Sequence, residues 1–184
     1  MVTSMASYCI ADPHLNHFNI IRLTDRPFNG LKEMQLRIFK SWNELVKKDT
    51  DIVYIVGDLW MGKNKVDNLE KMLNQAKGRK ILILGNHDEI KPFTYIRHGI
   101  ESVHTSLLVS PSESGLPCNV YFAHDPAIYT CLPDLAFMVC GHVHKLFKVQ
   151  KGCVNAGVDI WDFKPVSLDT LYEVYQEGIK CVDI

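Results

Sequence analysis

The chain has 184 residues, 47% of them hydrophobic and 22% charged, and its formal net charge at pH 7 is -1. These values predict a single globular domain over residues 1–184 and argue against a disordered or fibrous protein. No basic tract is present, so the sequence gives nucleic acid no electrostatic support as a partner.

Targeting signals and disulfide patterns are also missing from the sequence. The N-terminal residues lack the basic start and apolar core of a signal peptide, and no stretch approaches the roughly 20 apolar residues that a membrane span needs. The six cysteines include no C-x-x-C pair, which argues against zinc-finger ligation. We therefore expect a cytoplasmic, reduced protein that does not act at a membrane. The sequence favours no particular oligomeric state.

The first half of the chain alternates between strands and helices. Apolar residues recur at helical spacing over residues 31–48, and a second helix is predicted from a capping Asn64 to residue 77. The polar segment 17–29 contains Pro27 and is predicted to be a loop. Short apolar runs predict three buried strands, at residues 8–11, 52–56 and 81–84. This order predicts a parallel sheet with right-handed crossovers.

The second half has short strands with few gaps long enough for a helix. A turn is predicted at residues 110–117, which are rich in Ser, Gly and Pro, and Ser167 can cap a last helix over 168–176. The strand candidates are residues 103–109, 119–123, 137–140, 146–150 and 153–155. A second sheet, more mixed than the first, is therefore expected.

Five of the apolar runs end in side chains that ligate metals or transfer protons. One such group recurs by chance, but five together predict a metal or polar catalytic site, because ligands bind at the carboxyl ends of strands in open α/β sheets. The groups are Asp12-Pro13-His14, Gly57-Asp58, Gly85-Asn86-His87-Asp88, His124-Asp125 and Gly141-His142-Val143-His144.

The residue types narrow the choice of metal. Imidazole and carboxylate groups without thiolates suit Zn, Mn or Fe(II). More ligands are present than one tetrahedral ion takes, whereas two ions about 3.5–4 Å apart, bridged by a carboxylate and a water, would use them all. Such a pair of ions is suited to in-line attack at phosphorus.

The order of these motifs resembles that of the calcineurin-like metallophosphoesterase superfamily, whose signature is D-x-H, G-D, G-N-H-D or G-N-H-E, a single His, and G-H-x-H. The resemblance extends from Cys9 to about Gly157. It is greatest with the small, uncapped bacterial and phage-type phosphoesterases, whose C-terminal part resembles residues 155–159. The resemblance implies an α/β fold, a four-layer αββα sandwich of two mixed sheets flanked by helices.

The resemblance also implies a role for each motif residue. His87 would donate a proton or hydrogen bond to the leaving group, with Asp88 orienting its ring. Asp58 would bridge two divalent ions, for which Mn²⁺ is the first expectation and Fe²⁺ or Zn²⁺ are possible. The first ion would be held by Asp12, His14 and His144, and the second by Asn86, His124 and His142.

Other polar residues are assigned by position alone. His17, Asn19 and Arg22 share the loop after the first ligands and are candidate phosphate-binding residues. Arg26 is interpreted as surface charge. Trp60 stands where the family often has a small or polar residue, and we expect it to pack the loop rather than restrict the substrate.

The resulting hypothesis is a metal-dependent phosphoesterase that hydrolyses phosphomonoesters or phosphodiesters by direct attack of a metal-bridging hydroxide. Its substrate would be a small phosphoester or nucleotide, since so short a chain leaves little room for a cap domain. One alternative is a catalytically silent metal-binding scaffold of the same fold, although the chain keeps Asp58, His87 and Asp88. A small nuclease is a second alternative, disfavoured by the missing basic tract. A metallohydrolase acting on amides or lactones would need a different motif order.

Overall fold

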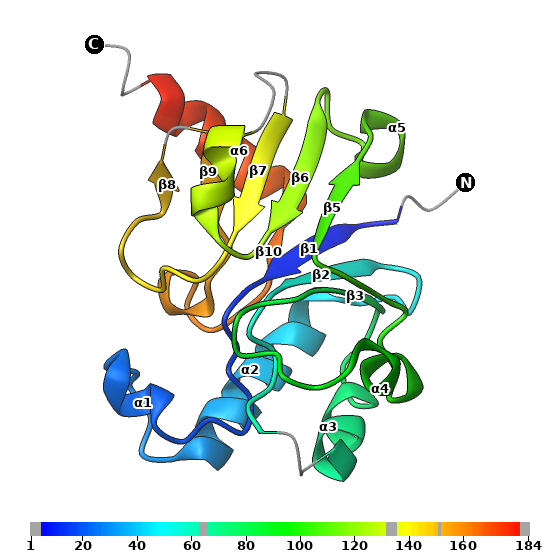
Figure 1. The fold of residues 1–184 in the computed structure, drawn as a ribbon, viewed down its shortest axis with the longest axis vertical. Helices are drawn as coiled ribbons and strands as arrows, with labels where there is room; N and C mark the ends of the chain where they lie inside the picture. Colours follow the sequence, from blue (N-terminus) through cyan, green and yellow to red (C-terminus); the bar gives the residue numbers. More distant parts are fainter. Residues whose placement is uncertain (1–4, 63–65, 132–135, 151, 181–184) are drawn as a thin grey trace.

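Two mixed β-sheets pack face to face in the computed structural model, which describes residues 5–62, 66–131, 136–150 and 152–180 (Figure 1). The first sheet has the strand order β10-β1-β2-β3-β4, with β1 Ser7–Ile10, β2 Ile52–Val56, β3 Arg79–Ile83, β4 Ser102–His104 and β10 Val166–Ser167. The second has the order β5-β6-β7-β9-β8, with β5 Ser106–Val109, β6 Asn119–Ala123, β7 Ala136–Cys140, β8 Val149–Gln150 and β9 Cys153–Asn155. Helices flank the sheets, which confirms the predicted fold class.

The first sheet is parallel from β1 to β4, as the alternation of strands and helices predicts. Its strands are nearly continuous apolar runs because both faces are covered, and every residue of β2 is buried. The antiparallel edge strand β10 pairs with β1. Two residues are too short a strand to show a periodic pattern, so the sequence did not predict it.

The prediction of one strand over residues 103–109 is wrong. The chain forms β4, then passes through Thr105 and forms β5 in the other sheet. Two short strands of different sheets therefore stand where the sequence predicted one, and they are separated by the single residue Thr105. The strand predicted at 146–150 is also shorter, since only β8 is regular.

Three short α-helices, at residues 20–23, 92–97 and 111–114, were not predicted, and the helices predicted to end at residues 48 and 77 end at Leu45 and Leu73. Within the predicted loop 17–29 the chain forms the single turn α1, and within the predicted turn 110–117 it forms α5, whose capping box joins Ser110 and Glu113. The capping Asn64 lies outside the described residues. The hydroxyl of Ser167 accepts from the N–H of Thr170 and so caps α6, as predicted. The bounds are α1 Ile20–Leu23, α2 Leu31–Leu45, α3 Val66–Leu73, α4 Pro92–Arg97, α5 Pro111–Ser114, α6 Leu168–Lys180, and the 3₁₀ helices η1 Pro126–Cys131 and η2 Val158–Ile160.

Two large apolar cores hold the layers together. One fills the space between the first sheet and its helices, where Trp42 of α2 and Tyr95 of α4 are buried. The other lies between the two sheets, where the rings of Tyr54 and Phe122 stack 4.3 Å apart. Phe137 contacts the rings of Tyr172 and Tyr175 of α6, which places this helix against the core between the sheets.

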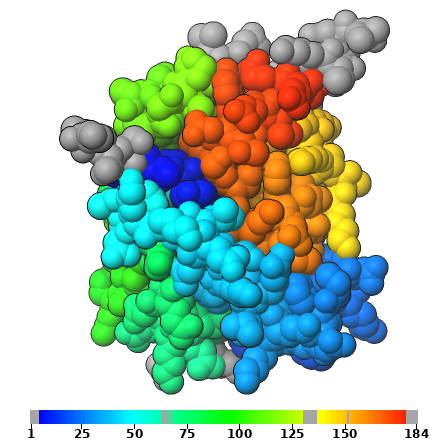
Figure 2. Space-filling view, turned by 180° about the vertical axis from the view of Figure 1, so that it is seen from behind, coloured from blue at the N-terminus to red at the C-terminus, as the bar shows by residue number. Residues whose placement is uncertain are grey.

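Seen from behind, α2 and the segment from residue 153 to α6 form one continuous surface (Figure 2).

Trp60 is buried in the first core, and its indole N–H donates to the carbonyl of Gly62, so it packs the loop as expected. Among the described helices, none combines the length and the apolar character that crossing a membrane would require.

Candidate metal centre

The predicted ligands meet at one place because both sheets present their strand ends there. Asp12 and His14 follow β1, Asp58 follows β2, and Asn86 follows β3 at the carboxyl edge of the first sheet. The second sheet contributes the remaining three, His124 after β6 and His142 and His144 after β7. All seven residues predicted as ligands lie in contact with at least one other member of the set.

Asp12, His14 and His144 form the first group. Their ligand atoms all lie within 4.8 Å of one another, and the rings of His14 and His144 are stacked with centroids 5.2 Å apart. The Nε2 atom of His14 is buried and has no hydrogen-bond partner among the described residues. Because a buried polar atom without a partner is costly, and two carboxylates lie within 4 Å of it, this atom fits a metal ligand.

Asp58 lies between the two groups of histidines. Its Oδ2 atom is 3.5 Å from Nε2 of His14 and 3.5 Å from Nε2 of His124. Asp12 and Asp58 also form a second possible cluster with His124, again with ligand atoms within 4.8 Å. A carboxylate at equal distances from a histidine of each group has the position that a bridge between two ions would need.

Asn86, His124 and His142 form the second group. The Oδ1 atom of Asn86 is 3.1 Å from Nε2 of His124 and 2.9 Å from Nδ1 of His142. The Nδ1 atom of His124 lies 2.9 Å from the carbonyl oxygen of Val56 and donates to it, so Nε2 is the nitrogen that faces the site and can bind an ion once it loses its proton. An amide oxygen and two imidazoles are the donor set expected for a second ion of borderline hardness.

Burial and the neighbouring charges shift the pKa values of four residues of the site. Burial raises the pKa of the Asp12 carboxyl to about 6 and lowers the pKa of His14 to about 3. Burial would also raise the pKa of Asp58, but hydrogen bonding and the charge of His124 lower it to about 2. For His124, burial is outweighed by the hydrogen bond and charges of Asp58 and Asp12, which raise its pKa to about 9. The carboxylates of Asp12 and Asp58 thus stabilise a positive charge in the site, here on His124.

The carboxylate of Asp88 binds the backbone around Asp58. Its carboxylate accepts hydrogen bonds from the N–H groups of Asp58, Leu59, Trp60 and Gly85 and from the hydroxyl of Tyr95, at 2.8–3.3 Å. In the described part of the chain, none of its hydrogen bonds comes from the ring of His87. The sequence suggested that Asp88 orients this ring, whereas these contacts indicate that it fixes the turns after β2 and β3.

His87 and His17 lie beside the first group of ligands. The centroid of the His87 ring is 5.5 Å from that of His14 and 6.2 Å from that of His17. His17 also approaches His14, with 3.4 Å between their Nδ1 atoms. Asn19 and Arg22 are exposed on α1, and no side-chain hydrogen bond joins either of them to the described site residues. Of the three candidate phosphate-binding residues, the fold brings His17 to the site.

Strained backbone conformations are concentrated at the ligands. Five predicted ligands have φ between 47° and 72°, in the left-handed region that residues with side chains seldom adopt: Asp12, His14, Asp58, His142 and His144. Such conformations persist where the surrounding structure enforces them, and they cluster at functional sites. The backbone is therefore bent so that the side chains after each strand turn toward one another.

At two glycines of the motifs there is no room for a side chain. A Cβ atom on Gly57 would overlap the imidazole of His124, and one on Gly85 would overlap the carboxylate of Asp58. Gly57 also has φ of 86°. The G-D and G-N-H-D motifs thus let ligands from neighbouring strands approach closely.

Arg26 is not surface charge, as the sequence suggested, because it is only 4% exposed. Its guanidinium group forms a buried ion pair with Asp159, whose Oδ2 atom lies 2.8 Å from Nδ1 of His144. The sequence reasoning assigned no role to Asp159, although this residue ends the segment 155–159 that resembles the family. Asn155 supports the same loop through a hydrogen bond to the carbonyl of His144.

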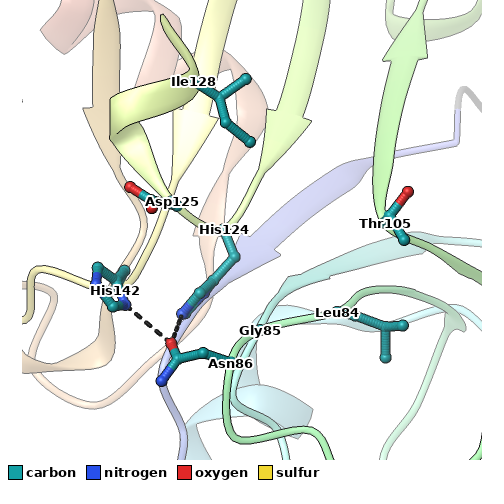
Figure 3. A pocket seen from close by; sticks show the side chains of 8 residues that line it. All are labelled: Leu84, Gly85, Asn86, Thr105, His124, Asp125, Ile128 and His142. Atoms are coloured by element: carbon teal, nitrogen blue, oxygen red, sulfur yellow. Dashed lines mark hydrogen bonds between the residues drawn. The ribbon is translucent and has the colours of Figure 1, made fainter.

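A pocket of about 240 Å³ opens beside the second group of ligands (Figure 3). In the close-up, His124, Asn86 and His142 lie on one side, and Leu84 and Thr105 lie across from them. None of the eight described residues that line it is a lysine or an arginine: Leu84, Gly85, Asn86, Thr105, His124, Asp125, Ile128 and His142.

Comparison with known proteins agrees with the fold and the motifs. The family model for calcineurin-like phosphoesterases matches residues 5–124. An uncharacterised protein of Methanocaldococcus jannaschii is 31% identical over 179 residues, covering 93% of this chain and 92% of its own length. A protein of Mycobacterium phage D29, the gene 66 product, is 38% identical over 177 residues, covering 82% and 86% of the two chains.

A solved structure shows the same fold. A protein of unknown function from Aquifex aeolicus superposes with a TM-score of 0.72 at 23% identity, covering 93% of this chain and all of that one. Together with the family model, which matches well over half of the residues, these findings confirm the resemblance that the motif order indicated. The chain belongs to the calcineurin-like phosphoesterase family.

Proposed function

We propose that the protein is a phosphoesterase with two divalent ions, Mn²⁺ by preference, that hydrolyses small phosphomonoesters or phosphodiesters in the cytoplasm. The observation that carries this proposal is the position of Asp58, 3.5 Å from a histidine of each ligand group, beside the unpartnered Nε2 atom of His14. When bound, the ions would neutralise charge on the phosphoryl oxygens and activate a water for attack.

The residues have distinct roles in this proposal. Asp12, His14 and His144 would hold one ion, Asn86, His124 and His142 would hold the other, and Asp58 would contribute to both. His87 donates a proton or hydrogen bond to the leaving-group oxygen, since its ring lies next to the ligand group without belonging to it. Asp88 keeps Asp58 in place by holding the backbone on both sides of the site. His17 is a candidate contact for the phosphoryl group.

The pocket supports a small organic substituent rather than a nucleic acid chain. Leu84 and Ile128 provide apolar walls, Thr105 provides a hydroxyl, and the carboxylate of Asp125 would repel a further phosphate. An oligonucleotide places its next phosphate one nucleotide away from the scissile one, where cationic contacts would favour its binding. The nuclease alternative is therefore less well supported than a phosphoester with an uncharged substituent.

The test is hydrolysis of p-nitrophenyl phosphate, bis-p-nitrophenyl phosphate and a single-stranded oligonucleotide by metal-stripped protein with and without added Mn²⁺. Asp58→Asn is expected to abolish turnover and weaken both ions, whereas Asp49→Asn, at an exposed acidic residue, should behave as wild type. Faster hydrolysis of the oligonucleotide than of either small ester would favour the nuclease. Bound metal without turnover of any substrate would favour the catalytically silent scaffold.

A further inference from the structure

Arg26 and Asp159 form a buried ion pair directly behind His144. The Nε and Nη2 atoms of Arg26 donate to Oδ1 and Oδ2 of Asp159, both at 2.8 Å, and both side chains are fully buried. The same guanidinium group donates to the carbonyl oxygens of Asp12 at 2.8 Å and Pro13 at 3.3 Å. One arginine therefore holds the carboxylate of Asp159 and the backbone that carries Asp12 and His14.

The ion pair determines which nitrogen of His144 carries the proton. Oδ2 of Asp159 lies 2.8 Å from Nδ1 of His144. An ionised carboxylate can only accept hydrogen bonds, so Nδ1 is the donor and Nε2 keeps the lone pair that a metal needs. His144 forms the first ligand group together with Asp12 and His14.

We propose that Asp159, held by Arg26, is a positioning residue that sets the tautomer and ring orientation of His144 for the first metal ion. This proposal depends on the metal centre of the proposed function but not on any particular substrate. A carboxylate hydrogen-bonded to a ligating histidine fixes the ring and raises its basicity, and its loss typically costs 10–100-fold in metal affinity. The corresponding histidine of the second group, His124, is oriented by the carbonyl of Val56 instead, so the effect of Asp159 is confined to one ion.

Asp159→Asn tests the proposal with little change in shape. If the new NH₂ group takes the place of Oδ2, it donates to Nδ1 of His144 and moves the imidazole proton to Nε2, the nitrogen that the ion needs. If it takes the place of Oδ1, it points at Nε of Arg26, and the two donors repel each other. Either orientation loosens His144.

The measurement is a titration of the metal-free protein with Mn²⁺, in which free Mn²⁺ is counted by electron paramagnetic resonance. In Asp159→Asn we expect one ion to bind about 10–100-fold more weakly and the other to bind as in wild type. The matched control is Asp162→Asn, which breaks the exposed ion pair with Arg37 and should leave both affinities unchanged. A folded Asp159→Asn protein that binds both ions with wild-type affinity would overturn the proposal.

A second measurement on the wild-type protein does not depend on how the variant folds. Long-range ¹H–¹⁵N nuclear magnetic resonance of the metal-free protein should show the neutral ring of His144 protonated at Nδ1, and a proton at Nε2 would contradict the proposal. Wild-type protein that binds no divalent ion would overturn the metal centre and this inference together. Binding of two ions without hydrolysis of any phosphoester would count against the enzyme only.

Discussion

At the scale of single residues, His87 serves the site through two separate groups. Its backbone N–H donates to Oδ1 of Asp58 at 2.8 Å, while its ring lies next to the rings of His14 and His17. Substitution by alanine keeps the N–H and removes only the ring. The two roles can therefore be separated by experiment.

We expect His87→Ala to bind metal as wild type but to lose activity unevenly. A general acid contributes about 10²–10⁴-fold where the leaving group needs a proton, so kcat/KM for phenyl phosphate should fall by about that factor and fall much less for p-nitrophenyl phosphate. His98→Ala, at a histidine paired with Glu70 away from the site, is the matched control. Equal losses on good and poor leaving groups would remove His87 from the role of acid.

Metal affinity should rise with pH because two of the proposed ligands hold protons in the metal-free protein. Burial raises the pKa of Asp12 to about 6, and for His124 the neighbouring carboxylates outweigh burial and raise the pKa to about 9. A ligand must lose its proton before it binds an ion. Below pH 6 protons on both residues weaken metal binding. Between pH 6 and 9 mainly the proton on His124 does so, and above pH 9 neither residue carries a competing proton.

Proton release gives a direct measurement of this effect. Binding of Mn²⁺ at pH 7 should expel the proton of His124, which isothermal titration calorimetry in two buffers of different ionisation enthalpy can count. Affinity that stays constant from about pH 6 to about pH 9, with no proton released, would show that the ligands are already deprotonated.

The sequence pointed to the candidate ligands but not to the residues that support them, for a physical reason. Asp12, Asp58 and the histidines stand directly after apolar strands, and their residue types predict a metal site wherever the strands lie. Arg26 and Asp159 are 133 positions apart; Arg26 stands in no motif, and the segment that Asp159 ends shows no pattern that links it to Arg26 or His144. Their pairing depends on how the loops pack across the two sheets, which no local pattern records.

At the scale of elements, the junction between β3 and its following turn depends on Gly85. A Cβ atom at this position would meet the side chain and the backbone nitrogen of Asp58, on the turn after the neighbouring strand. The two turns are thus packed too tightly to accept even a methyl group. Asp88 links the same turns by hydrogen bonds to the N–H groups of Asp58 and Gly85.

Gly85→Ala is expected to displace Asp58 and so weaken both ions. Overpacking of this kind costs about 1–3 kcal/mol, which denaturant unfolding of the metal-free protein can measure, and the metal titration should show lower affinity at both sites. Gly30→Ala is a suitable control for metal affinity, because no atom lies within 4 Å of the added methyl group. If Gly85→Ala retains wild-type stability and metal binding, the close approach to Asp58 is not what requires a glycine.

Element prediction succeeded where a pattern belonged to one environment. The strands β1, β2 and β3 are covered on both faces and read as apolar runs, and α2 has a clear amphipathic spacing. The prediction of one strand at 103–109 failed because a single residue separates two strands of different sheets, too short a break to be recognised as a turn. The single turn α1 was not predicted, because a polar segment containing a proline resembles a loop.

At the scale of the whole molecule, the proposed metal centre connects the two sheets. Asp12, His14, Asp58 and Asn86 follow strands of the first sheet, and His124, His142 and His144 follow strands of the second. The core between the sheets holds them together away from this edge. Bound ions would add contacts at an edge where, without them, buried carboxylates and imidazoles face one another.

Metal binding should therefore stabilise the entire fold. Two ions that bind only the native state add about 2.7 kcal/mol each at 100 times their Kd, which for a domain of this size raises Tm by about 5–10 °C per ion. Scanning calorimetry of the protein stripped with EDTA, before and after addition of Mn²⁺, measures the shift. Asp162→Asn should show the full shift and Asp58→Asn a much smaller one, because Asp58, unlike the exposed Asp162, lies 3.5 Å from a histidine of each ligand group. A Tm that Mn²⁺ leaves unchanged in the wild-type protein would mean that the ions do not prefer the native state, and the strained backbone at five of the seven candidate ligands would then need another explanation.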